Sequence, residues 1–311
     1  INLDGTSRDS AVGDFNLDGK ADVVMANWDD DSIVLFYGDG RNGFTKIDEY
    51  FVGERFYTSS RPDLTDEDYD NDAHPKEIIS GDFNSDGWLD IVVVDSGENE
   101  LRDKLPWEDG GTVFVLLNDK NGKFEDRQKQ FGQFSYEDHK PKGGTVGDFN
   151  KDGFLDIAVT DYNLGGGVID SDGDYHTNHE DGLSVLNGDA SGDFYYSDAV
   201  NTYRSAYDIC TADFNSDGFL DLAYVTGGPS SYASEDDRLR VLFANGNGGF
   251  SNRMDYEIGP SVNTLTFGDF NSDGGVDIIT AHNYGSVDYC VLINDGSGGF
   301  NNIQRIDYDA D

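Results

Sequence analysis

Basic residues and long hydrophobic runs are both scarce in this sequence of 311 residues. It has 21 Lys and Arg against 62 Asp and Glu, so its formal net charge at pH 7 is −41. Such an excess of negative charge repels nucleic acid and anionic membranes, which argues against a role in binding either. No stretch approaches the ~20 apolar residues that a membrane-spanning helix needs, so we expect no insertion into a bilayer.

Cysteine is almost absent as well. Cys210 and Cys290 are too few for a disulfide scaffold. They fall in neighbouring repeats, at positions expected to lie too far apart to bridge. We therefore predict two buried thiols and no disulfide between them.

Sequence signatures of enzymes are also missing. There is no G-x-S-x-G nucleophile elbow, no H-E-x-x-H zinc motif, no phosphate-binding glycine loop and no dinucleotide fingerprint. Because the residue pattern specifies no reaction, a catalytic role is the less favoured interpretation.

One nine-residue pattern, in contrast, occurs five times in the chain. The copies read D-F-N-x-D-G-x-x-D and begin at intervals of 56 to 68 residues, at Asp14, Asp82, Asp148, Asp213 and Asp269. Each copy is followed by a run of apolar, mostly β-branched residues, which is typical of a strand. We call this pattern the cassette and number its positions from one to nine.

The cassette supplies the oxygen donors that Ca²⁺ prefers. The side chains at positions one, three and five lie on one side of a tight turn, which the glycine at position six permits. The backbone carbonyl at position seven and the Asp at position nine complete a set suited to Ca²⁺, which takes about six to eight oxygens. Zinc and copper are not expected, because the cassette has no Cys or His. We predict about five Ca²⁺ ions, with these ligands: Asp14, Asn16, Asp18, Lys20, Asp22, Asp82, Asn84, Asp86, Trp88, Asp90, Asp148, Asn150, Asp152, Phe154, Asp156, Asp213, Asn215, Asp217, Phe219, Asp221, Asp269, Asn271, Asp273, Gly275 and Asp277.

Two other interpretations of the cassette were weighed. The calcium loop that joins two helices needs a Glu at position twelve, and here position twelve is Met25, Val93, Val159, Tyr224 and Thr280. That interpretation fails in every copy. The other is a set of Asx turns that bind no metal, which the recurrence of Asp at position nine disfavours.

The cassette resembles the FG-GAP/VCBS repeats of integrin α-subunit propellers and of related proteins, and the resemblance covers essentially the whole chain. It implies a β-propeller with calcium-binding repeats. The Gly-Ala-Pro element of the integrin repeats is absent, and Phe-Gly precedes the cassette only at Phe267-Gly268. This departure weakens the expectation of integrin-like partners.

Strand-like runs support the same fold. Each interval holds four of them, which in the second repeat are 77–81, 89–94, 111–117 and 124–131, and four short strands per unit are typical of a propeller blade. We predict an all-β fold with a single β-propeller domain over residues 1–311. Its five blades are expected at about 6–60, 75–135, 140–201, 205–259 and 260–311. The alternative is a fragment of a larger, for example seven-bladed, propeller, because residues 1–5 resemble the end of an outer strand.

The connections on the face opposite the cassettes are long and differ among the repeats. Variable loops on a rigid scaffold often carry function, and all five histidines fall in them. A solvated loop residue is the commoner reading of any single histidine there. The candidate ligand-binding residues are Trp28, His74, Trp107, His139, Tyr162, His176, His179, His282 and Tyr284. A partial cassette in the third repeat predicts a possible sixth Ca²⁺ at Asp170, Asp172 and Asp174.

We expect a calcium-stabilised, lectin-like binding or adhesion module that engages a glycan or an extracellular protein. Trp and Tyr stack on sugar rings and anchor protein interfaces, and the high calcium concentration outside cells favours an extracellular or cell-surface location. One alternative is a polysaccharide lyase or hydrolase on the same face, with Arg61, Arg102 or Arg204 neutralising a uronate. The other is a structural subunit of a surface layer or filament that self-assembles.

Overall fold

The structure is a computed structural model in which every regular element of the described residues is a β-strand. The described residues are 6–52, 74–96, 111–124, 128–131, 141–161, 167–169, 175–177, 182–200, 205–227, 237–283 and 287–307.

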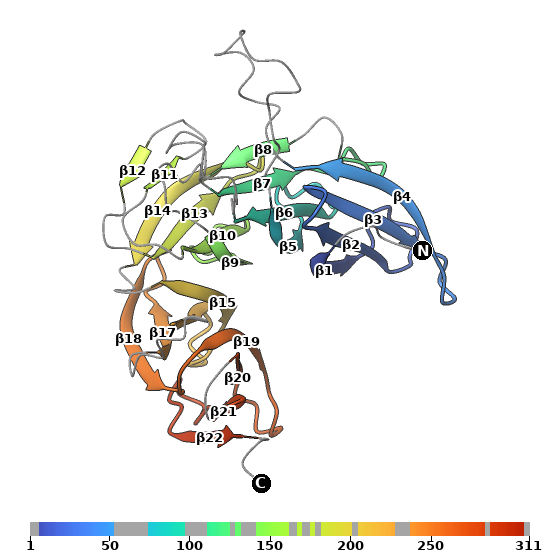
Figure 1. The fold of residues 1–311 in the computed structure, drawn as a ribbon. Helices are drawn as coiled ribbons and strands as arrows, with labels where there is room; N and C mark the ends of the chain where they lie inside the picture. Colours follow the sequence, from blue (N-terminus) through green and yellow to red (C-terminus); the bar gives the residue numbers. More distant parts are fainter. Residues whose placement is uncertain are drawn as a thin grey trace, which may run out of the picture. The chain divides into compact units, whose positions relative to one another are not determined.

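The described strands form five four-stranded antiparallel sheets, which we call blades one to five in chain order (Figure 1). Blade one contains β1 (Ser7–Gly13), β2 (Asp22–Asn27), β3 (Ser32–Gly38) and β4 (Phe44–Phe51). Blade two contains β5 (Pro75–Gly81), β6 (Asp90–Asp95), β7 (Thr112–Leu116) and β8 (Gln128–Phe131). Blade three contains β9 (Pro141–Gly147), β10 (Asp156–Asp161), β13 (Leu183–Gly188) and β14 (Phe194–Val200). Blade four contains β15 (Ala206–Ala212), β16 (Asp221–Thr226), β17 (Arg238–Ala244) and β18 (Phe250–Glu257). Blade five contains β19 (Val262–Gly268), β20 (Asp277–His282), β21 (Tyr289–Ile293) and β22 (Asn302–Ile306).

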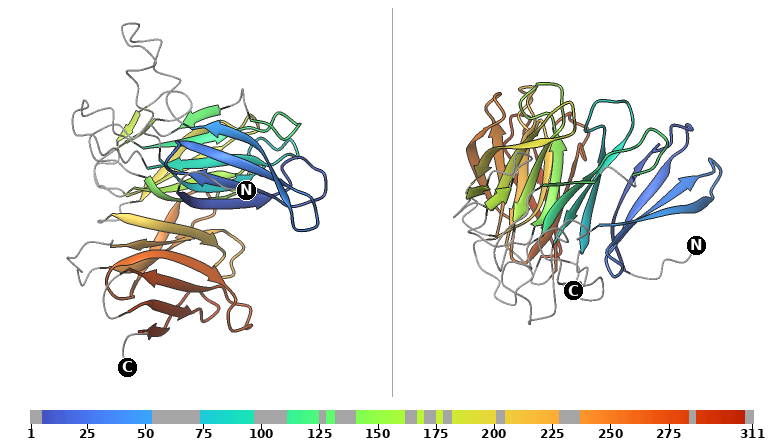
Figure 2. Two further views of the ribbon diagram at one scale, coloured as in Figure 1. Left: turned by 45° about the vertical axis from the view of Figure 1, so that its right-hand side comes forward. Right: turned by 90° about the horizontal axis from the view of Figure 1, so that it is seen from above.

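The strands of each blade pair in sequence order, and Figure 2 shows the sheets from two further directions. The first two strands of a blade pair so that the last residue before a cassette lies opposite the ninth residue of that cassette, as Gly13 does with Asp22 and Gly81 with Asp90. This pairing closes the cassette into a short loop between the two strands.

The apolar runs after the cassettes become strands that are largely buried. All six residues of β6 are buried, and so are all six of β16. Val and Ile dominate β6, and β-branched side chains pack well on a pleated sheet that is covered on both faces. In blades two and four, the cassette is therefore followed by a strand that is buried along its whole length.

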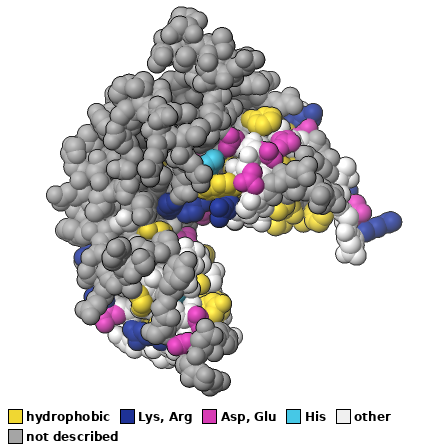
Figure 3. Space-filling view, in the orientation of Figure 1, with side chains coloured by type: hydrophobic (Ala, Val, Ile, Leu, Met, Phe, Trp, Pro, Cys, Tyr) yellow, Lys and Arg dark blue, Asp and Glu magenta, His cyan; other side chains and the backbone are white. Residues whose placement is uncertain are grey.

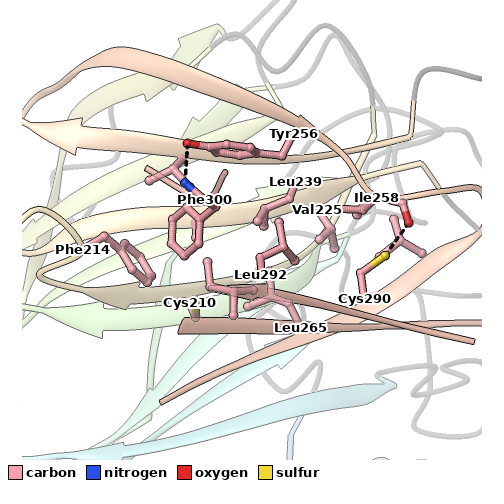
Figure 4. Packing of buried hydrophobic residues seen from close by; sticks show 14 of the residues in the cluster. Cys210, Phe214, Val225, Leu239, Tyr256, Ile258, Leu265, Cys290, Leu292 and Phe300 are labelled. Carbon is pink, nitrogen blue, oxygen red and sulfur yellow. Dashed lines mark hydrogen bonds between the residues drawn. The ribbon is translucent and has the colours of Figure 1, made fainter. Parts of the chain in front are cut away.

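The chain divides into two compact units, of which the first comprises 1–141 with 190–193 and the second 142–189 with 194–311. In the first unit, Phe124 packs edge-on against both Phe15 and Tyr50, with ring centroids 6.3 and 5.6 Å apart. In the second unit, Phe214, Tyr256 and Phe300 make the same kind of edge-on contacts (Figure 4). Such pairs add stabilisation beyond their buried area.

Both thiols lie in the core of the second unit (Figure 4). Cys210 and Cys290 are buried and free, and the Cys290 thiol donates a hydrogen bond to the carbonyl of Ile258 at 2.7 Å. The prediction of two buried thiols is confirmed. Burial raises the pKa of both thiols, so each stays in its unreactive protonated form.

The all-β class and the four-stranded repeat unit are confirmed, and each sheet falls inside the residue range expected for its blade. One expectation was wrong. The five histidines were expected to lie in loops, but His282 is the last residue of β20 (Asp277–His282), and His176 lies in a small ladder of β11 (Gly167–Ile169) and β12 (Tyr175–Thr177). Residues 1–5 and Asp170, Asp172 and Asp174 lie outside the described residues. A single closed propeller domain stays a prediction.

Candidate functional site

The cassettes occupy the same place in every blade, between its first and second strands. They join β1 to β2, β5 to β6, β9 to β10, β15 to β16 and β19 to β20. The ninth residue of each cassette is the first residue of the strand that follows it. The sequence prediction that the cassette connects two strands is therefore confirmed in each blade.

The first six positions of the cassette form a turn that is closed by its own backbone. In the first copy, Asp14 accepts hydrogen bonds from the amides of Asp18 and Gly19, and Asn16 accepts a second bond from the amide of Asp18. The position-one bonds recur in all five copies at 2.8–3.0 Å.

Two left-handed residues shape this turn. Position four has φ between 54° and 63°, and the glycine at position six has φ between 81° and 94°, in every copy. The glycine adopts this conformation without steric cost because it has no Cβ. The residue at position four has a Cβ, so the same conformation raises its free energy. The residues at position four are Leu17, Ser85, Lys151, Ser216 and Ser272.

The Asp at position nine faces the interior of the blade. In the first copy, Asp22 accepts the amide of Phe15 at 3.0 Å through one oxygen and the amide of Gly38 at 2.9 Å through the other. The same two bonds, at 2.7–3.0 Å, are made by Asp90, Asp156, Asp221 and Asp277. All five carboxylates are 0% exposed. Each therefore joins the cassette to the end of the third strand of its blade.

Burial perturbs these interior carboxylates. It raises the pKa of Asp90, Asp156 and Asp221 to about 6, against the opposing effect of the two backbone amides that each accepts. The neighbouring carboxylates Asp82 and Asp86 add to the rise at Asp90. Negative charge is therefore concentrated in the loop and costly to keep there, which is the setting that a bound cation relieves.

In every cassette, the side-chain nitrogen of a lysine or an asparagine contacts the position-five carboxylate. Lys20 lies 2.8 Å from Asp18, and Lys120 lies 3.4 Å from Asp86. In the last three copies the position-three amide donates to the position-five carboxylate at 2.8–3.0 Å: Asn150 to Asp152, Asn215 to Asp217 and Asn271 to Asp273.

The donor set of the cassette fits Ca²⁺ in chemistry, since it consists of carboxylate, amide and carbonyl oxygens in one short loop. In this arrangement the loop is closed on its own amides. Among the described residues, no three His, Cys, Asp or Glu side chains are grouped closely enough to hold a metal ion. In the first cassette, Lys20 would have to leave Asp18 for that carboxylate to bind an ion. The calcium ligands remain a prediction.

Two of the candidate ligand residues come together in the first unit. Trp28, in the turn between β2 and β3, stacks on His74 with ring centroids 4.6 Å apart, and the guanidinium of Arg8 lies 4.5 Å from the Trp28 ring centroid. His74 also lies 3.4 Å from Asp31. Arg8 and Asp31 were missed by the sequence analysis, because nothing in the local pattern of either segment indicates that they meet a tryptophan. We call Arg8, Trp28, Asp31 and His74 the Trp28 cluster.

His282 has a different environment, inside blade five. One ring nitrogen lies 2.9 Å from the carbonyl of Pro260 and the other lies 3.0 Å from the hydroxyl of Thr280. Burial lowers its pKa, so the ring is neutral near pH 7. Both ring nitrogens are engaged, which indicates a structural role for this residue.

The structure does not describe the side chains of the remaining candidates. His176 belongs to β12, and nothing is described of its side chain. Candidates outside the described residues are Trp107, His139, Tyr162, His179 and Tyr284, together with Arg61, Arg102 and Arg204 of the lyase alternative. The described residues contain no helix that could cross a membrane.

The fold and the loops thus define a protein of repeated four-stranded blades, each with the same Asp-rich turn. Comparison with known families agrees, since residues 82–159 match the FG-GAP-like repeat. This segment contains the second and third cassettes, so the resemblance inferred from the cassette is confirmed there.

Two known proteins are similar over longer stretches. The T-cell immunomodulatory protein homolog of Plasmodium falciparum (isolate 3D7) is 24% identical over an alignment of 273 residues that covers 78% of this chain. The chain spans about a third of the length of that relative, since the match covers 33% of it. A crystal structure of virginiamycin B lyase from Staphylococcus aureus matches with a TM-score of 0.46 and 13% identity, over 100% of this chain and 87% of that one. Likeness at that level supports no argument about function.

Proposed function

We propose that this protein is an extracellular or cell-surface binding module whose blades are stabilised by Ca²⁺ in the cassettes. The observation that carries the proposal is the repetition of one turn, with the same hydrogen bonds and the same left-handed positions, in all five blades. A turn conserved to this degree within one chain has a common task in each blade. Its exposed oxygens are suited to a hard cation.

The repeat class and the relative support the binding role. Residues 82–159 match the FG-GAP-like repeat, and the Plasmodium relative is named as a homolog of a T-cell immunomodulatory protein. We extend from these the proposal that the chain binds an extracellular protein or a glycan. The Trp28 cluster is the described surface that fits this role, because it places an indole, an imidazole, a guanidinium and a carboxylate together at the opposite end of the blade from the cassette.

The calcium half of the proposal is tested by thermal unfolding. Protein treated with chelator and then titrated with CaCl₂ should show a rising melting temperature, because a ligand of the native state at about 100 times its Kd adds about 2.7 kcal/mol per site. MgCl₂ should have a smaller effect, since Mg²⁺ demands a more regular shell. Equal melting temperatures in CaCl₂ and in excess chelator would overturn the proposal that Ca²⁺ stabilises the blades.

The binding half is tested with a neutral-glycan array and an array of extracellular receptor domains, probed with labelled protein in CaCl₂. Any specific signal should be weakened at least about tenfold by Trp28→Ala, the scale of loss for an anchoring tryptophan. Met254→Ala, which truncates an exposed side chain of blade four, serves as the control and should leave the signal unchanged. Equal signals from wild type and Trp28→Ala would remove the Trp28 cluster from the proposal.

A further inference from the structure

The chain contains five Asn-Gly pairs, and all five lie in the described residues, at 42–43, 121–122, 187–188, 245–246 and 247–248. In such a pair the backbone nitrogen of the glycine can attack the side-chain amide of the asparagine, since glycine has no side chain in the way. Whether a pair reacts in the folded protein depends on what holds the asparagine side chain and the glycine amide.

Hydrogen bonds restrain four of the five pairs. In three of them the glycine amide donates to a side-chain oxygen at 3.0–3.1 Å: Gly43 to Asp39, Gly122 to Asn118 and Gly188 to Asp156. In the fourth, the Asn245 side chain accepts the amides of Asn247 and Gly249, at 2.9 and 3.3 Å. A donating amide is a poor nucleophile, and an accepting side chain is held on its own loop.

The fifth pair, Asn247-Gly248, lacks both restraints among the described contacts. It lies in the hairpin between β17 and β18, whose first position is Ala244. The corresponding position in blades two and five is Asn118 or Asn294, and that side chain accepts the amide of the tip glycine. Because alanine has no such oxygen, the amide of Gly248 has no acceptor in the described structure.

The Asn247 side chain is exposed, and it makes no contact among the described residues. A Cβ on Gly248 would lie 3.1 Å from the Cβ of Asn150, so the hairpin tip packs on the third cassette. The hairpin and the third cassette both belong to the second unit. The surroundings of this pair are therefore defined within one unit.

We propose that Asn247 is a site of spontaneous deamidation that yields isoaspartate. The Gly248 amide loses its proton to hydroxide, its nitrogen bonds to Cγ of Asn247, and the Cγ–Nδ2 bond breaks. The Nδ2 group takes a proton from water and leaves as ammonia, which regenerates hydroxide. One water molecule then opens the cyclic imide at either carbonyl, which gives aspartate or isoaspartate.

Both products alter the tip of this hairpin. Each carries a new carboxylate, and isoaspartate also adds one carbon to the backbone beside Gly248. The contact of the tip with Asn150 cannot keep its geometry after that insertion, so the modified protein should unfold at a lower temperature. Asp and Glu side chains already lie on the described surface (Figure 3). One more carboxylate makes the chain still more negative and should delay its elution from an anion-exchange column.

The test ages the folded protein in mildly alkaline buffer with chelator, so that its outcome does not depend on bound Ca²⁺. Peptide mass spectrometry that separates aspartate from isoaspartate then follows each pair, with protein digested at the start as the background. Asn247 should react at least about fivefold faster than Asn121, the factor that one hydrogen bond of typical net strength supplies. In urea all five pairs should react at similar rates. A rate at Asn247 no higher than at the other pairs of the folded protein would overturn the proposal.

Two variants separate the free amide from other causes. Ala244→Asn supplies the acceptor that blades two and five have, so it should slow the reaction at Asn247 about fivefold. An unchanged rate in this variant would contradict the role of the free amide. Asn247→Ser copies Ser297 of blade five and removes the site. Its melting temperature should stay constant during ageing while that of wild type falls, and an equal fall in both would contradict the effect on stability.

Discussion

Within one cassette, the Asp at position five and the Asp at position nine have very different surroundings. The surroundings of either position differ much less from one cassette to another. Position nine is buried and accepts two backbone amides from different parts of its blade, while position five is at the surface and accepts a lysine or an asparagine side chain. Both positions carry Asp in every copy. The same residue type therefore serves two purposes, since one carboxylate belongs to the blade and the other is available to a ligand.

The largest effect is expected at the buried end. Asp156→Ala leaves the amides of Phe149 and Gly188 without their acceptor, and each buried unsatisfied amide costs about 1–3 kcal/mol. The free energy of unfolding, measured with urea, should fall by about 2 kcal/mol or more in chelator. It should fall further in CaCl₂, because Asp156 is also among the predicted Ca²⁺ ligands. Equal stability of variant and wild type in chelator would show that this carboxylate serves only the metal.

The matched change at the exposed end should behave differently. Asp152→Ala removes a side chain whose described contacts lie within its own loop, so the melting temperature in chelator should change little. In CaCl₂ the variant should lose the stabilisation supplied by the third cassette. Calorimetry should count one ion fewer than in wild type, and an unchanged count would contradict the ligand assignment.

A smaller effect separates the first cassette from the third. The ammonium group of Lys20 is paired with the Asp18 carboxylate. Each group stabilises the charged form of the other, which lowers the pKa of Asp18 and raises the pKa of Lys20. Lys20→Gln should therefore raise the calcium affinity of the first cassette by about threefold, as expected for an exposed pair. Lys151→Gln is the control, because Lys151 lies over the Phe219 ring and has no contact with a position-five carboxylate among the described interactions.

The smallest expected effect concerns the thiols. Cys210 and Cys290 should react with an aromatic disulfide reagent only as fast as the second unit opens, because burial raises the pKa of both. Chelator should accelerate the reaction if calcium stabilises this unit. Rapid labelling of both thiols in CaCl₂ would contradict their burial.

Repetition explains what could be predicted from the sequence. A cassette followed by a β-branched run indicated a loop between two strands, and the spacing indicated four strands per unit. The partners of position nine could not be predicted, because Gly38 and Gly188 are distant in sequence from the carboxylates that they contact and share no motif with the other residues in that place.

The Trp28 cluster shows the same limit. Trp28 and His74 were each named as candidates, yet their stacking depends on how blade one meets blade two. The small ladder of β11 and β12 was missed because its segment is rich in glycine and aspartate, which favour turns.

The side-chain amide of Asn118 has a consequence beyond its own blade. It donates to the carbonyl of Phe15 in the first cassette and to that of Leu89 in the second, and Asn294 bridges Phe214 and Val276 in the same way. One side-chain amide is thus hydrogen-bonded to two neighbouring cassettes at once. Where blades interact through such nearest-neighbour links, unfolding follows the logic of a one-dimensional chain of coupled units. On the proposal that the loops bind Ca²⁺, loss of the ion from one loop would then lower the stability of the next blade before that of more distant ones.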